Sequence, residues 1–161
     1  HLTAEEREVV GEAPRALGPG EAARFVVEAA RVAARADAAM VGATTFGAGL
    51  PAGPVTRFAF DACVRFDGPL FTAEVDGAWL RRLVARSNQG PETPWEKRTG
   101  ENLVTVAPEV IDDRARYRFV TTDWVARNAA AYLGENPPAL VQHPSAKLKA
   151  AAQAALRTQR K

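Results

Sequence analysis

The stretch LFTAEVDGAWL, residues 70–80, holds two secondary-structure patterns on either side of one glycine. Residues 70–75 alternate between two faces, which is the pattern of a half-buried strand. From Gly77 to Ser87 the apolar residues Trp79, Leu80 and Leu83 recur at helical spacing. The stretch therefore predicts a strand that leads directly into a helix.

Upstream of this stretch the sequence predicts two strands and two helices. From Glu21 to Ala36 apolar residues recur at helical spacing, and arginine and glutamate occupy the opposite side. The predicted elements are a strand at 7–11, a helix at 21–36, a buried strand at 37–42, a glycine-rich loop at 47–53 and a short helix at 58–65.

Downstream of it, strands are predicted at 102–107 and 117–122, joined through an acidic turn at 111–113. Asp123 is suited to cap a helix that continues through Tyr132, because its carboxylate can accept the first free amide hydrogens. Ser145 is the predicted N-cap of a last helix at 146–159. Because strands and helices are mixed without strict alternation, we expect an α+β fold, with residues 1–161 forming a single domain.

The composition narrows the class of protein. Of the 161 residues, 47% are hydrophobic and 25% charged, which is typical of a folded domain and excludes a disordered or collagen-like chain. No apolar run approaches the roughly 18 residues of a membrane-spanning helix. No signal peptide is visible at the start, and Cys63, the only cysteine, is expected to be a buried thiol.

The charge distribution does not predict a nucleic-acid partner. The net charge is +2, and the last fifteen residues hold five cations and no acid, so the rest of the chain stands at −3. The predicted helix at 146–159 is mostly alanine and has no interleaved aromatic residues, which favours a solvated terminal helix.

Residues for hydrolysis or metal binding are scarce. The two histidines, His1 and His143, lie far apart in the sequence, and His143 is expected on an exposed loop. A dinuclear metal site needs several His, Asp and Asn ligands around ions roughly 3.5–4 Å apart. We therefore expect neither catalytic nor metal-binding residues in this chain.

Five segments occur in an order that carries a family resemblance. They are ADAAMV at 36–41, LPAGPVT at 50–56, VRF at 64–66, LFTAEVDGAWL at 70–80 and RYRFVTTDWVA at 116–126. Their order and spacing resemble the C-terminal domain of the 5'-nucleotidase family, which includes bacterial UDP-sugar hydrolases and ecto-5'-nucleotidases. The similarity runs from about Val9 to Tyr132. It implies layered sheets with flanking helices.

The resemblance also implies a division of labour between two domains. In the family this domain recognises the nucleoside, while a separate N-terminal domain holds two divalent metal ions and performs the hydrolysis. The implied partners are that metallophosphatase domain, in the same or a separate chain, and a nucleotide-like small molecule, without nucleic acid or membrane. Such a chain is expected to be a piece of a larger assembly, in a periplasmic or secreted setting.

The implied substrate-binding residues follow from the family's positions. Phe66 and Tyr132 fall on the two aromatic positions that clamp a base in the family, where each ring can stack without reading base edges. Thr44, Thr45 and Phe46 lie in residues 42–47, which match the family's own glycine-rich loop and are expected to line the cleft. Together these five residues form the predicted binding site.

Departures from the family's pattern occur at the same places. The loop's usual asparagine and arginine positions hold Gly42 and Gly47, and no neighbouring threonine can replace an arginine's planar donors. Residues 128–131, NAAA, replace a glycine-rich turn and predict a helix that continues to Tyr132. These departures predict an altered pocket.

Two other interpretations remain open. The domain could be a structural or docking module with a degenerate pocket, or it could serve a branch of the family that acts on another small anionic ester, including the sulfur-compound hydrolases. The polar loop at 89–98 holds Trp95, which could anchor an interface or fold back over the core.

Overall fold

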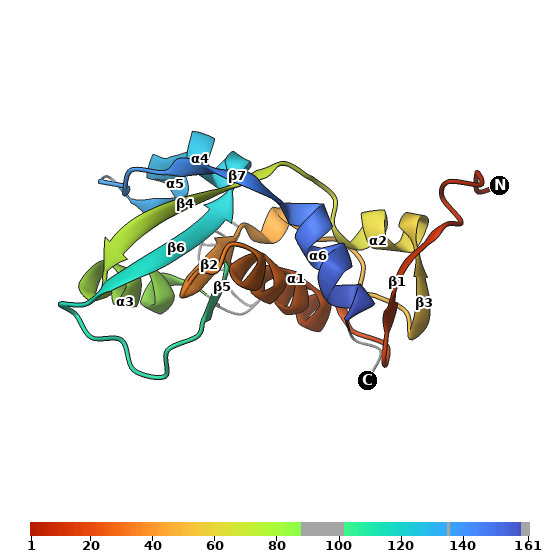
Figure 1. Ribbon diagram of the computed structural model, residues 1–161, viewed down its shortest axis with the longest axis horizontal. Coiled ribbons are helices and arrows are strands. Elements are labelled where there is room, and N and C mark those ends of the chain that lie inside the picture. The colour runs from red at the N-terminus through yellow and green to blue at the C-terminus, as the bar shows by residue number, and fades with distance from the viewer. Residues whose placement is uncertain (88–101, 135, 159–161) are drawn as a thin grey trace.

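A five-stranded sheet is the main layer of the computed structural model, which describes residues 1–87, 102–134 and 136–158 (Figure 1). The strand order is β5-β2-β6-β4-β7. The pair β2–β6 is parallel, and the other neighbours are antiparallel. The strands are β2 (Ala38–Val41), β4 (Pro69–Asp76), β5 (Leu103–Val106), β6 (Arg116–Thr122) and β7 (Val141–Lys147). The predicted loop with Trp95 lies outside the described residues.

A second, two-stranded sheet stands at the other end of the molecule, beside a short helix (Figure 1). Its strands β1 (Val9–Ala13) and β3 (Gly53–Thr56) are antiparallel, and helix α2 (Arg57–Cys63) follows β3 directly. The side chain of Thr56 caps α2 by accepting a hydrogen bond from the amide of Ala59 at 3.2 Å.

Helices cover both faces of the five-stranded sheet. Helices α1 (Pro19–Ala33) and α6 (Leu148–Arg157) share one core cluster, while α3 (Gly77–Arg86), α4 (Asp123–Arg127) and α5 (Ala129–Leu133) share the other. Strand β2 alternates between the clusters: Ala39 and Val41 join the first, Ala38 and Met40 the second. This layering confirms the predicted α+β fold with flanking helices.

The predicted helix through Tyr132 is interrupted at Asn128. The cap of α4 is Thr122 and not Asp123, because the Thr122 hydroxyl accepts the amide hydrogen of Val125 at 3.3 Å. Asn128 leaves the helical conformation (φ −123°, ψ 37°), and its side-chain amide donates to the carbonyl of Trp124 at 2.8 Å. Two short helices, α4 and α5, therefore replace the continuous helix.

The prediction for the C-terminal segment was wrong in one respect, because it missed strand β7. Ser145 lies inside this strand and caps nothing, and α6 begins only at Leu148. The carboxylate of Asp67 accepts the Lys149 amide at 3.1 Å and so performs the capping role from another element. His143, expected on a loop, also lies in β7, where an edge position tolerates the following proline.

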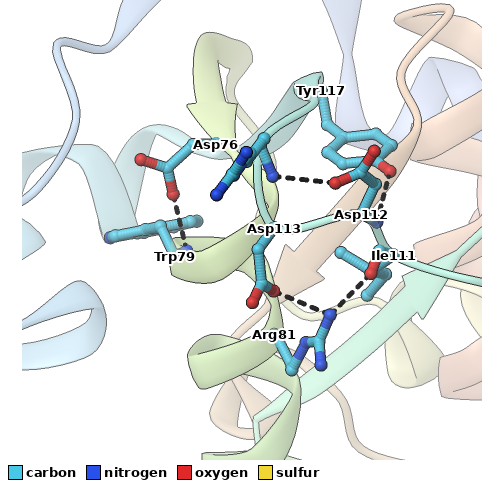
Figure 2. Close-up of polar contacts among 8 residues, drawn as sticks. Asp76, Trp79, Arg81, Ile111, Asp112, Asp113 and Tyr117 are labelled. Atoms are coloured by element: carbon cyan, nitrogen blue, oxygen red, sulfur yellow. Dashed lines mark hydrogen bonds and ion pairs between the residues drawn. The ribbon is translucent and has the colours of Figure 1, made fainter.

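The glycine at the β4–α3 junction is required by a close backbone approach. Residues 111–117 fold over the start of α3, and a Cβ atom at Gly77 would lie 1.8 Å from the carbonyl oxygen of Asp112. Polar contacts hold this junction together (Figure 2). Asp76 caps α3 through the Trp79 amide at 2.8 Å, and Arg81 contacts Asp113 at 2.7 Å.

Replacing Gly77 with alanine is expected to lower the free energy of unfolding by about 2–3 kcal/mol, because the backbone at Asp112 must shift to admit a methyl group. Urea unfolding followed by circular dichroism measures this loss. Gly20→Ala is the matched control, since nothing lies within 4 Å of its Cβ position. Equal unfolding midpoints for both variants would contradict the proposed contact.

Cys63 is fully buried, and burial raises the pKa of its thiol from 9.0 to about 11. We therefore expect the native thiol to resist a disulfide reagent at pH 8 and to react fully after unfolding. Because the pKa is raised on folding, the stability contributed by this group is complete below pH 9 and declines as the pH rises towards 11. Rapid stoichiometric labelling of the native chain would show that the thiol is accessible.

Candidate functional site

A pocket of about 660 Å³ lies at one end of the strands of the five-stranded sheet. This volume is within the range of roughly 300–1,000 Å³ typical of small-molecule sites. The lining residues come from segments far apart in the sequence: Thr44, Thr45, Arg65, Phe66, Asp67, Gly68, Thr122, Asp123, Trp124, Arg127, Tyr132 and Leu148.

The strand directions explain why these segments meet. Because β2 and β6 are parallel, the residues that follow both strands emerge at the same end of the sheet. Strand β4 is antiparallel to β6, so the residues that precede it, 65–68, reach this end as well. Strand β7 is antiparallel to β4 and delivers Leu148 there. The topology thus gathers four connections around one pocket.

Four of the five predicted site residues line this pocket, namely Thr44, Thr45, Phe66 and Tyr132. Phe46 is not among the lining residues. It is half-buried, packs against the first core cluster and forms a bridge with Val64. The structure therefore places Phe46 in a packing position, and substrate binding by the other four stays a prediction.

The pocket contains a third aromatic residue that the sequence reasoning missed. Trp124 is 52% exposed, and Phe66 is 57% exposed. The indole nitrogen of Trp124 donates a hydrogen bond to the hydroxyl oxygen of Tyr132 at 3.0 Å. In one continuous helix, residues eight positions apart are separated by about 12 Å along the axis. The break at Asn128 is what lets the two side chains meet.

Gly42, which stands at the family's usual asparagine position, lies beside the ring of Tyr132. A Cβ atom at residue 42 would lie 3.4 Å from ring atom Cε1 of Tyr132, so a longer side chain would crowd the ring. Asn102, from the start of β5, accepts a long hydrogen bond of 3.4 Å from the Ala43 amide. A buried asparagine from another element thus supports the loop.

Gly47, which stands at the family's usual arginine position, lies beside the side chain of Arg65. A Cβ atom at residue 47 would lie 2.5 Å from the Ala62 carbonyl oxygen and 3.2 Å from Cδ of Arg65. Position 47 therefore has no room for a side chain, and the stem of Arg65 lies beside it. Arg65 was missed because the sequence reasoning sought an arginine within the loop.

Both carboxylates of the pocket are engaged locally. Asp67 accepts hydrogen bonds from the backbone amides of Gly68 at 2.8 Å and Lys149 at 3.1 Å. Asp123 pairs with Arg127 at 3.2 Å. These contacts fix the loop at 67–68 and the start of α6 around the pocket.

Within residues 1–87, 102–134 and 136–158, no group of three or more His, Cys, Asp or Glu side chains is arranged to hold a metal ion. None of the helices in these residues is long and apolar enough to cross a membrane.

Solved structures with the same fold include two nucleotidases and a sulfate thiohydrolase. A 5'-nucleotidase precursor from Thermus thermophilus superposes with a TM-score of 0.73 and 16% identity, over 96% of this chain and 37% of that chain. Haemophilus influenzae NAD nucleotidase superposes with a TM-score of 0.58 and 22% identity, over 80% of this chain and 30% of that chain. Thermus thermophilus sulfate thiohydrolase, solved with glycerol, superposes with a TM-score of 0.60 and 16% identity. The match covers 96% of this chain and 33% of that chain.

At these identities the likeness establishes the fold, and the chain spans only about a third of each structure's length. No curated protein sequence matches the chain. The family described as "5'-nucleotidase, C-terminal domain" matches residues 3–134, which is most of the sequence. The chain therefore belongs to the 5'-nucleotidase C-terminal domain family.

Proposed function

We propose that this chain is the substrate-recognition domain of a 5'-nucleotidase-like metallophosphoesterase, and that its pocket binds the ring of a nucleotide or a related phosphoester. The observation that carries the proposal is the grouping of Phe66, Trp124 and Tyr132 around one pocket. Each side chain comes from a different connection or helix, so the sheet topology holds the three together.

The exposure of the aromatic side chains supports binding of a flat ligand. Phe66 and Trp124 each leave about half of their surface open, and both line a pocket of about 660 Å³. Stacking of a base on an aromatic side chain contributes roughly 1–3 kcal/mol and tolerates different bases. A ring placed here would cover apolar surface that the chain alone leaves exposed.

In this proposal the hydrolytic chemistry belongs to a companion metallophosphatase domain, in the same or a separate chain, with two divalent metal ions. This chain contributes by holding the leaving group, since positioning alone can remove a large part of a reaction barrier. The proposed setting is periplasmic or secreted. Two structural neighbours are named as a 5'-nucleotidase and an NAD nucleotidase, and both names denote nucleotide substrates.

A second candidate function is recognition of a different small anionic ester, and one observation favours it. The polar loop positions hold Gly42 and Gly47, so the loop offers fewer donors than the family pattern, and a sulfate thiohydrolase shares the fold. The third candidate, a structural or docking domain, needs no ligand at all. Titration with nucleotides separates the first candidate from the other two.

Titration calorimetry of the 161-residue chain with adenosine, AMP and UDP-glucose is expected to give saturable heat with at least one ligand. Phe66→Ala should weaken that binding about 5–150-fold, the equivalent of about 1–3 kcal/mol of stacking. Phe58→Ala is the matched control, because Phe58 is 50% exposed but lies outside the pocket lining. Absence of heat with all three ligands would refute nucleotide recognition.

Trp124 provides an internal reporter of the same event. We expect ligand binding to change tryptophan fluorescence, and Trp124→Phe to remove that change. The variant should also weaken binding about 2–10-fold, because Tyr132 loses a hydrogen bond while an aromatic face remains. Trp79, packed edge-on against Phe119 with centroids 5.2 Å apart, and Trp95 remain in the variant as the background signal. A response that persists in the variant would place the ligand elsewhere.

A further inference from the structure

We propose that Arg65 is the anion-binding residue of this pocket, and that the natural ligand carries a negatively charged ester group beside its ring. The inference rests on the proposed function and adds the residue that recognises the charged group of the ligand. Arg65 belongs to the α2–β4 connection and precedes Phe66, one of the exposed rings.

The charged groups of the pocket are not equivalent. Asp67 accepts two backbone hydrogen bonds, and Asp123 and Arg127 neutralise each other across 3.2 Å. Among the described residues, no ion pair or hydrogen bond engages the guanidinium of Arg65. Within the described part of the chain, Arg65 is therefore a positive group of this pocket that no carboxylate pairs.

A backbone contact fixes where the Arg65 side chain begins, and the side chain then passes Gly47. The Arg65 amide donates to the Thr45 carbonyl at 2.8 Å, which ties the connection to the 43–45 turn. The side-chain atoms Cγ and Cδ lie 3.5 and 3.2 Å from the Cβ position of Gly47, where a side chain would displace them. The carbon Cζ lies 5.5 Å from the centroid of the Phe66 ring.

These contacts place the guanidinium over one face of the Phe66 ring, so that charge and aromatic surface lie together. A guanidinium is a planar group with five donors, suited to bind two oxygens of a phosphate or a similar anion at once. A ligand whose ring contacts Phe66 would bring a nearby anionic group within reach of Arg65. Arg65 thereby supplies, from a different connection, the cation that the loop at Gly47 lacks.

The test compares AMP with adenosine, which differ only in the phosphate. We expect the wild-type chain to bind AMP about tenfold more tightly than adenosine, as one charge-assisted contact in an open pocket provides. Arg65→Gln should reduce this ratio to about one while the affinity for adenosine changes less than about twofold. Arg65→Lys keeps the positive charge but loses the planar set of guanidinium donors, so it should give an intermediate ratio of affinities.

Controls separate this inference from the proposed function. Arg114→Gln removes an equal charge outside the pocket and should leave the ratio unchanged, and circular dichroism checks that each variant is folded. Raising the salt concentration should reduce the preference for AMP in wild type but not in Arg65→Gln. A ratio that is already one in wild type, or that survives in Arg65→Gln, overturns the role of Arg65 alone. If wild type binds neither ligand, the proposed function fails, and this inference fails with it.

Discussion

The parallel pairing of β2 with β6 is the constraint on which the rest of the structure depends. All four residues of β2 are buried, which makes it the most deeply buried strand of the sheet. Their side chains belong alternately to the two core clusters. Antiparallel strands could be joined by a tight turn, but a parallel pair needs a long connection. The chain places β4, α2 and α3 within that connection. As a result, the ends of β2 and β6 and the start of β4 converge, and the pocket forms where they meet.

Much of the layer structure follows from local patterns in the sequence. The apolar run at 37–42 identifies β2, because a strand buried on both faces has apolar residues in succession. The alternation at 70–75 identifies β4, because a strand buried on one face alternates apolar and polar residues. Strand β7 was not predicted, because it lacks such an apolar pattern. It lies at a sheet edge with mostly exposed side chains and contains a proline, so no periodic apolar signal marks it. Backbone pairing with β4 alone defines this strand.

The residues of the candidate site likewise fall into those that the sequence predicted and those that it did not. Phe66 and Tyr132 could be proposed from the order of motifs, and both line the pocket. Trp124 and Arg65 could not, because their importance depends on neighbours distant in sequence. Trp124 reaches Tyr132 only after the chain breaks at Asn128, and Arg65 lies in the pocket only because Gly47 leaves space for its stem. Contacts of this kind depend on tertiary packing, which periodicity in a single sequence does not encode.

The contact between the first strand and the last helix has a consequence for how the chain folds during synthesis. Gly11 of β1 lies so close to α6 that a Cβ atom there would be 2.5 Å from Cβ of Leu156, and Val10 and Leu156 share one core cluster. About 145 residues separate the two contacting positions along the chain. The core cluster that includes α1, β1 and β3 therefore cannot be completed until α6 has been synthesised. Until then, the side chains of α1 and β1 that contact α6 lack those partners.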